Sequence, residues 1–163
     1  MEQIVEQAGH KTLWTLRKYA TENAYREGKH YAVAEINGNL LLNEGIGEFI
    51  DLLCGIGGTA FSEGHAYIGV GDSDIAAAAI QTALQAAANK AYAPMVAGYP
   101  VRVNQTVTFR AVFAAEAANF DWKEFTVINA ATDTGKNLNR RVSSQGTKTA
   151  GQVWSVDVAI TFS

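Results

Sequence analysis

Residues 153–162 read Val-Trp-Ser-Val-Asp-Val-Ala-Ile-Thr-Phe, and apolar side chains occupy every second position from Trp154 to Phe162. Residues 106–113, Thr-Val-Thr-Phe-Arg-Ala-Val-Phe, alternate in the same way. Successive side chains of a β-strand point to opposite faces of a sheet, so this alternation predicts two strands that each bury one face. These two stretches favour a fold in which β-sheets pack one side against a core.

Four further stretches have the composition of strands. They are rich in β-branched and aromatic residues, and they cover residues 66–70, 92–98, 122–129 and 138–143. Turn-forming residues separate most of these stretches at intervals of roughly ten residues, which is typical of antiparallel all-β domains. We therefore expect a mainly β fold, an antiparallel β-sandwich or open barrel, with one or two short helices and an extended N-terminal arm.

One segment has the spacing of a helix instead. Between residues 43 and 54, four large apolar residues recur at i, i+3, i+4 and i+7, which places them on one helical face: Ile46, Phe49, Ile50 and Leu53. Asn43 is a plausible N-cap and Gly55 a plausible C-terminal glycine. We expect this helix to be held by tertiary packing and to cover an edge or one end of the sheets.

A second helix is predicted over the alanine-rich residues 75–88. Ile80 and Leu84 would share a face, and Ser73 or Asp74 would cap the N-terminus. Alanine has the highest helix propensity, although alanine runs also occur in extended segments.

The N-terminal region differs from the rest of the chain because charged residues of both signs are scattered through it. We therefore predict two parts, an extended arm over residues 1–38 and a β-rich domain over residues 39–163. Within the arm, residues 12–19 and 31–36 are predicted to be extended around a turn near Glu27 and Gly28. Such a segment has little core of its own, so it must lie on the main domain or on another subunit to be ordered.

Charge and composition exclude several classes of function. The net charge of −3 argues against a broad cationic surface for nucleic acid. The first residues lack the basic start and apolar run of a signal peptide, and the longest apolar stretch is too polar and too short to cross a bilayer, so we expect a soluble protein. The single cysteine, Cys54, is expected to be a small buried hydrophobe in the helix over 43–54.

Few residues have the spacing of a catalytic, cofactor or metal site. Gly55-Ile56-Gly57-Gly58 lacks the pattern of a phosphate-binding loop, so we interpret it as a turn. Asp72, Ser73 and Asp74 offer oxygen ligands for Ca²⁺ or Mg²⁺, but such residues are also favoured in turns. The remaining polar candidates are scattered and have neither zinc spacing nor a glycine-flanked nucleophile: His10, His30, His65, Ser143 and Ser144. We predict no catalytic, cofactor-binding or metal residue.

Arginine and aromatic residues leave two binding hypotheses open. Arg140 and Arg141 could grip a carboxylate or phosphate of a neighbour, but a solvated strand end is the simpler interpretation. Six aromatic residues could form a sugar-stacking platform, although aromatic residues at alternating strand positions usually belong to a core: Trp14, Trp122, Trp154, Tyr67, Tyr92 and Tyr99.

The order of several short motifs resembles that of virion proteins of tailed bacteriophages. These motifs cover the chain from Asn39 onward and read Asn-Leu-Leu-Leu-Asn-Glu-Gly (39–45), Tyr-Ile-Gly-Val-Gly-Asp (67–72), Val-Thr-Phe-Arg-Ala-Val-Phe (107–113), Ala-Asn-Phe-Asp-Trp-Lys-Glu-Phe (118–125) and Leu-Asn-Arg-Arg (138–141). The resemblance is to capsid decoration (cement) proteins and to the N-terminal attachment domains of tail-collar fibres. It implies a non-enzymatic particle component and transfers no functional residue.

A polar arm joined to a compact β domain is similar to the build of decoration proteins that bind as interwoven trimers. The preferred hypothesis is therefore a cement protein of the virion that forms a homo-oligomer, with a trimer expected, and binds the major capsid protein through strand addition by the arm. Deleting the arm is expected to abolish capsid binding while leaving the β domain folded. The alternatives are a tail or baseplate adaptor, a carbohydrate-binding module with Trp122 or Trp154 exposed, and a small hydrolase or metal enzyme that uses Asp72 and Asp74.

Overall fold

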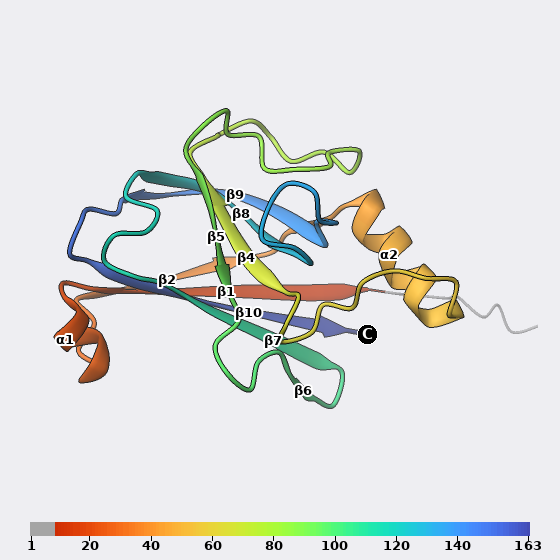
Figure 1. Cartoon of the computed structure of the whole chain (residues 1–163), viewed down its shortest axis with the longest axis horizontal. Coiled ribbons are helices and arrows are strands. Elements are labelled where there is room, and N and C mark those ends of the chain that lie inside the picture. The colour runs from red at the N-terminus through yellow and green to blue at the C-terminus, as the bar shows by residue number, and fades with distance from the viewer. Residues whose placement is uncertain (1–8) are drawn as a thin grey trace, which may run out of the picture.

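The structure, a computed structural model, describes residues 9–163. Two five-stranded antiparallel sheets pack face to face as a sandwich, which confirms the predicted mainly β fold (Figure 1). The first sheet contains β1 (His10–Tyr19), β2 (Ala32–Asn37), β6 (Val101–Val103), β7 (Thr106–Phe113) and β10 (Val153–Phe162). The second contains β3 (Leu40–Leu41), β4 (Tyr67–Gly71), β5 (Lys90–Pro94), β8 (Asp121–Ile128) and β9 (Asn139–Thr147). Within residues 9–163, two helices complete the fold, α1 (Glu22–Arg26) and α2 (Asn43–Cys54).

The strand order is β2-β1-β10-β7-β6 in the first sheet and β3-β9-β8-β4-β5 in the second. The strands β7 and β10 have the predicted bounds, and they pair directly, with Trp154 opposite Phe113 and Val158 opposite Phe109. The other predicted strands are shifted by a few residues at their ends. Three short elements, α1, β3 and β6, were not predicted, because each is too short to show a hydrophobic period.

The core lies between the two sheets and is rich in aromatic residues. Trp14, Trp122 and Trp154 are almost fully buried, at 0%, 0% and 1% exposure. The rings of Trp122 and Trp154 meet edge to face with centroids 4.8 Å apart, a favoured geometry for aromatic pairs. The prediction that these tryptophans form the core is confirmed, and a sugar-stacking platform built on them is ruled out.

The three tyrosines of the same hypothesis are only partly buried. Tyr92 lies over Gly69, where an added Cβ would come within 2.7 Å of the ring, and Tyr99 lies against the guanidinium of Arg110. Tyr67 begins β4. The rings of Tyr92 and Tyr99 therefore pack on neighbouring residues.

The predicted division of the chain at residue 38 does not appear in the packing. Strand β1 lies between β2 and β10 and pairs with β10 along its whole length, from His10 opposite Phe162 to Tyr19 opposite Val153. Its Trp14 and Leu16 are fully buried in the common core. The charged residues of β1 made it difficult to recognise in the sequence that its apolar residues alternate toward the core. Residues 10–37 therefore belong to the sandwich, and the part of the predicted arm over residues 1–8 lies outside the described residues.

The two predicted helices have different outcomes. Helix α2 is present, and Gly55 ends it in the left-handed conformation with φ 66°, as predicted. The predicted cap at Asn43 is wrong by one position, because Leu42 is the N-cap and provides no side-chain hydrogen bond. The helix predicted over residues 75–88 is also wrong, since this segment is coil with isolated turns. Within residues 9–163, neither helix has the length and apolar character needed to span a membrane.

Candidate functional site

Helix α2 is attached to the sandwich by polar contacts. Glu48 is only 9% exposed, and its Oε1 accepts hydrogen bonds from the backbone N–H of Thr59 and from Nδ2 of Asn129, the latter at 2.9 Å. One turn earlier, Oε1 of Glu44 accepts from the backbone N and the Nδ2 of Asn137, at 2.7 and 3.0 Å. Two carboxylates four residues apart thus fix the inner face of the helix.

A glycine allows this close attachment. An added Cβ at Gly45 would lie 2.5 Å from the Cα of Leu138 and 2.6 Å from the carbonyl oxygen of Asn137. Such distances are well inside van der Waals contact, so any larger residue would push the helix away from the 137–138 backbone. The inner face of α2 is therefore made of Glu44, Gly45 and Glu48.

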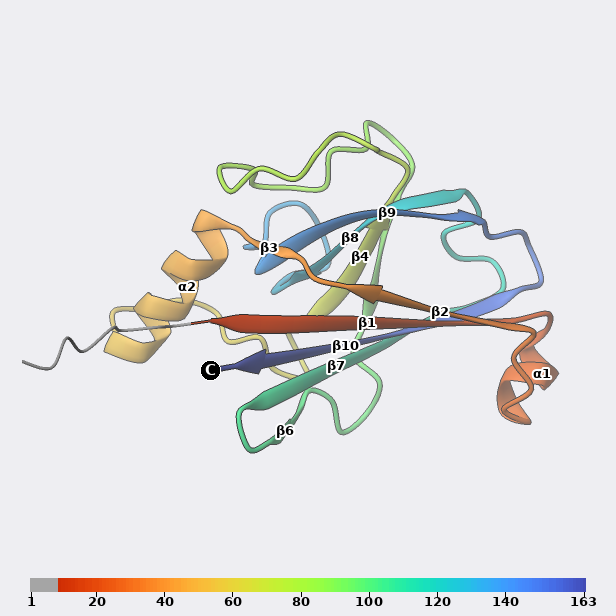
Figure 2. The same ribbon diagram turned by 180° about the vertical axis from the view of Figure 1, so that it is seen from behind.

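The apolar face of α2 consequently points to solvent. Helix α2 lies at one end of the sandwich, opposite the end that carries α1 (Figures 1 and 2). The four residues that predicted the helix, together with Ile56 just beyond it, are 41 to 75% exposed: Ile46, Phe49, Ile50, Leu53 and Ile56. We call these five residues the α2 apolar surface. The helix is held by tertiary contacts at one end of the sheets, as expected, but these contacts lie on its polar side (Figure 1). Surface helices usually bury their apolar stripe, so this orientation is unusual.

A shallow apolar groove adjoins the α2 apolar surface. It has a volume of about 260 Å³ and is lined by Leu41, Gly45, Ile46, Phe49, Leu138 and Phe162. The rings of Phe49 and Phe162 are stacked, with centroids 6.4 Å apart and an interplanar angle of 14°. The end of β10 thereby extends the surface beyond the helix.

Cys54 lies at the C-terminal end of α2 and is exposed. The prediction that it is a buried core residue is wrong, because it followed from the assumption that the helix turns its apolar side inward.

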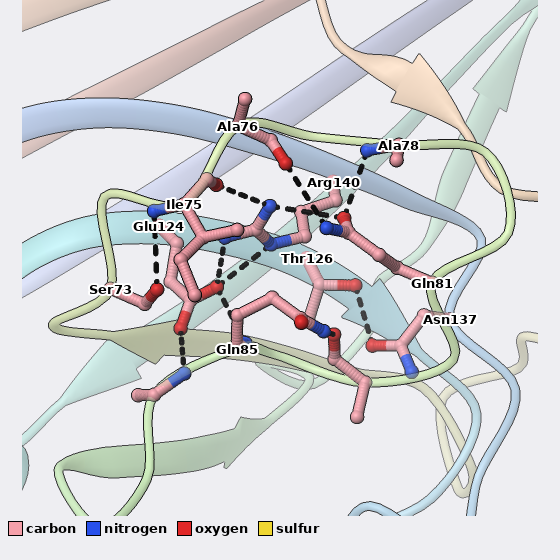
Figure 3. A network of polar contacts seen from close by, with 12 residues as sticks. Ser73, Ile75, Ala76, Ala78, Gln81, Gln85, Glu124, Thr126, Asn137 and Arg140 are labelled. Carbon is pink, nitrogen blue, oxygen red and sulfur yellow. Dashed lines mark hydrogen bonds and ion pairs between the residues drawn. The ribbon is translucent and has the colours of Figure 1, made fainter.

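Arg140 and Arg141 do not lie at a solvated strand end, as the simpler interpretation had predicted. Arg140 is 1% exposed and forms an ion pair with the fully buried Glu124, with Nη2 2.7 Å and Nε 2.8 Å from Oε2 (Figure 3). Arg141 is partly buried. Both hypotheses for Arg140 are wrong, since its guanidinium is neither solvated nor available to a partner.

The buried pair holds the coil over residues 72–89 against the outside of the second sheet. Glu124 accepts hydrogen bonds from the backbone N–H groups of Gln85 and Ala86 at 2.9 and 2.7 Å. Arg140 Nη1 donates to the carbonyl oxygen of Ile75 at 2.8 Å and to Oε1 of Gln81 at 3.1 Å (Figure 3). A helix would satisfy these backbone groups internally. Their bonds to Glu124 and Arg140 explain why the alanine-rich segment is not helical.

Two of the three predicted oxygen ligands of this coil, Asp72 and Ser73, bond within it as turn residues, and Asp74 is exposed. Ser73 Oγ accepts from the backbone N–H of Ile75 at 3.3 Å, and an Asp72 oxygen accepts from Nδ2 of Asn89 at 2.7 Å. Across the described residues, no group of three or more His, Cys, Asp and Glu side chains is arranged to hold a metal ion.

The histidines and serines lie in separate places. His10 Nε2 is 3.1 Å from Oδ1 of Asn39, and His65 Nδ1 is 3.0 Å from the hydroxyl of Ser62. His30 meets the ring of Tyr19 edge to face. Ser143 accepts a hydrogen bond from Gln145 at the exposed end of β9, where Ser144 also lies.

The chain matches no protein-family model, no curated protein and no solved structure. The function therefore has to be inferred from the surface that the structure presents, and the most unusual part of that surface is α2.

Proposed function

We propose that this protein is a non-enzymatic structural protein that binds another protein subunit through the α2 apolar surface. The observation that carries this proposal is the orientation of α2: Glu44, Gly45 and Glu48 face the sandwich, while the large apolar residues of the α2 apolar surface face outward. Contiguous exposed apolar patches on soluble domains mark sites of interaction. A rigid helix held by buried hydrogen bonds can present such a patch without reorganisation.

The charge of α2 favours a protein partner over an anionic membrane surface. The helix contains Glu44, Glu48 and Asp51 but no lysine or arginine. Helices that lie on membranes are usually rich in basic residues on their polar face.

We further propose that the subunit belongs to a tailed-phage virion and that its partner is the major capsid protein. The ordered motifs from Asn39 to Arg141 support this, because they resemble decoration and collar-fibre proteins. As a cement protein, the chain would bind the assembled shell as a homo-oligomer, with a trimer proposed. Binding to the assembled state alone stabilises that state by mass action, with no covalent step.

The alternative within the same particle is an adaptor or fibre-anchoring protein of the tail or baseplate. It would use the same α2 apolar surface, but at a site present in few copies. A carbohydrate-binding module built on Trp122 or Trp154 is not proposed, because both side chains are buried.

Deletion of the predicted arm is not a suitable test of capsid binding. Removing residues 1–37 would remove β1 with its buried Trp14 and Leu16, so loss of binding would report unfolding. Substitutions on α2 avoid this difficulty.

The test has two steps. First, quantitative mass spectrometry of purified virions measures the copy number of this chain against the major capsid protein; a ratio near one supports a cement protein, and a few copies support the adaptor. Second, co-sedimentation with capsids that lack the protein compares Leu53→Ser with the control Val103→Ser, which changes an exposed apolar residue of β6. We expect only Leu53→Ser to weaken binding. Equal binding by both variants would overturn the role of α2.

A further inference from the structure

A charged hollow lies on the first sheet, at the end of the sandwich that carries α1. It has a volume of about 220 Å³ and is lined by Arg17, Tyr19, Tyr25, Arg110, Val112 and Ser155. The lining residues come from β1, β7, β10 and α1, so four elements build it. Ligand pockets for drug-sized molecules occupy roughly 300 to 1,000 Å³, so this hollow accommodates a single small group rather than a nucleotide or a sugar chain.

Two guanidinium groups share one carboxylate at this hollow. Arg110 binds Asp157 in a bidentate manner, with Nε 2.7 Å from Oδ1 and Nη2 2.6 Å from Oδ2. Arg17 contacts the same Oδ2 through Nη1 at 3.3 Å. The three side chains together carry a charge of +1, because Asp157 neutralises only one of the two arginines.

The two arginines have different roles. Arg110 is fixed, since both of its bonds to Asp157 are short and its Cζ lies 4.6 Å from the centroid of the Tyr99 ring. Arg17 uses one of its five N–H donors in its long contact with Asp157, and its side chain is 34% exposed. The remaining donors of Arg17 are free to turn toward a ligand above the sheet.

The walls of the hollow add neutral donors. Tyr25 of α1 packs edge to face on Tyr19, with ring centroids 5.2 Å apart. The short helix is oriented by its N-cap Thr21, whose Oγ1 accepts from the backbone N–H of Ala24. Tyr19, Tyr25 and Ser155 line the hollow, and each carries a hydroxyl that can donate to an anionic oxygen.

We propose that this hollow binds a carboxylate monoanion, with Arg17 as the principal ligand-binding residue and the three hydroxyls as additional donors. The guanidinium fork matches the two oxygens of a carboxylate. A single excess positive charge beside Asp157 fits a monoanion better than a phosphate dianion. The carboxylate can come from a free small acid or from an Asp or Glu side chain on a partner protein.

One acidic residue of the chain competes with such a ligand. Glu35 lies on β2 opposite Thr15, two positions along β1 from Arg17, and it is exposed. Its charge lowers the attraction of the hollow for an anion, so its removal is expected to tighten binding.

The test uses the whole protein and two probes, acetate and the capped peptide Gly-Glu-Gly, with Gly-Gln-Gly as the uncharged control. Two-dimensional amide NMR follows the titration. We expect saturable shifts at Tyr19, Tyr25 and Ser155 with the acidic probes only. Arg17→Gln should weaken binding by about tenfold, the effect of losing one charge-assisted hydrogen bond. The matched control Lys11→Gln removes the same charge from an exposed position of β1 and should leave the affinity nearly unchanged. Glu35→Gln should strengthen it.

The outcomes are distinct. Binding of acetate without the peptide identifies a site for a free small acid, and binding of both identifies a receptor for an acidic side chain. Non-saturable shifts, or equal losses in Arg17→Gln and Lys11→Gln, would overturn the proposal and leave an internal ion-pair cluster. Each result is independent of whether the α2 apolar surface binds a capsid.

Discussion

Helix α2 and the coil over residues 72–89 are held to the sandwich in similar ways but differ in conformation. In both, carboxylates accept hydrogen bonds across the contact: the partly buried Glu44 and the buried Glu48 extend from α2, and the buried Glu124 extends from the second sheet to the coil. The helix keeps its own backbone hydrogen bonds and contacts the domain through side chains, except at its first residue, Asn43, whose backbone N–H donates to the carbonyl oxygen of Ala79 at 2.8 Å. The coil offers its backbone. A segment that gives up its backbone donors and acceptors to buried charges cannot remain helical, even when it is rich in alanine.

The largest effect is expected from breaking the anchor of the coil. Arg140→Met leaves Glu124 buried without its partner, and removing one member of a buried ion pair costs about 3–5 kcal/mol of the free energy of unfolding. Guanidinium denaturation measures this loss. The double variant Glu124→Gln/Arg140→Met should be less destabilised than Arg140→Met. The exposed arginine of β6 provides the control, and Arg102→Met should have little effect; a similar loss in both arginine variants would contradict this role of the pair.

The next effect tests the anchor of α2. Gly45→Ala would place a Cβ against the backbone of residues 137–138 and should destabilise the protein by about 1–3 kcal/mol, as overpacking does. Two residues later, an added Cβ at Gly47 meets nothing within 4 Å, so Gly47→Ala should stabilise the helix by up to about 1 kcal/mol. Thermal unfolding of the pair gives the answer, and a stabilising Gly45→Ala would show that the helix is not seated on this backbone.

A smaller effect is expected within the coil itself. Gln81 Nε2 donates to the carbonyl oxygen of Ala76, and its Oε1 accepts from Ala78 N–H and from Arg140. Gln81→Ala should cost about 1 kcal/mol, the usual net value of a hydrogen bond, and should speed amide exchange at residues 75–81. Amides of β7 serve as the internal reference. Unchanged exchange in the coil would mean that the buried ion pair alone orders it.

The smallest change in stability is expected on the exposed face of α2. Leu53 is 75% exposed, so Leu53→Ser should alter the free energy of unfolding by no more than about 0.5 kcal/mol. The same change should lower the fluorescence of a bound hydrophobic dye. Leu42→Ser, at a buried position one residue before the helix, is the contrasting control and should be strongly destabilising. A large loss of stability in Leu53→Ser would place this side chain in the core and remove the proposed binding surface.

The sequence predicted which segments form strands and helices better than it predicted which face of a helix meets the domain. Strands β7 and β10 were predicted at their observed bounds because their alternation is uninterrupted. Helix α2 was predicted because its apolar residues have helical spacing, but spacing does not say which face meets the domain. The signal that could have revealed the orientation lies on the opposite face of the helix, where Glu44 and Glu48 lie on either side of Gly45 in the sequence.

The coil over residues 72–89 and the Glu124–Arg140 pair that holds it could not be predicted from local sequence patterns. Glu124 and Arg140 lie on neighbouring strands β8 and β9, and Arg140 stands next to Arg141 in a stretch that looks solvated. Their pairing follows from strand register, which the sequence did not show. The hollow at Arg17 was missed for the same reason, since Arg17, Arg110 and Asp157 come together only when β1, β10 and β7 lie side by side.

The position of β1 between β2 and β10 also has a kinetic consequence. The first and last strands of the sandwich pair along ten residues, from His10 opposite Phe162 to Tyr19 opposite Val153. The first sheet therefore cannot close during synthesis until the final strand has left the ribosome. Pairing of residues so distant in sequence carries a large loop-closure entropy and places such folds among the slow two-state folders, in the range of about milliseconds to seconds. Until that step, β1 has only β2 to pair with and the core face that carries Trp14 and Leu16 lacks β10, so a chaperone is expected to bind the nascent chain here.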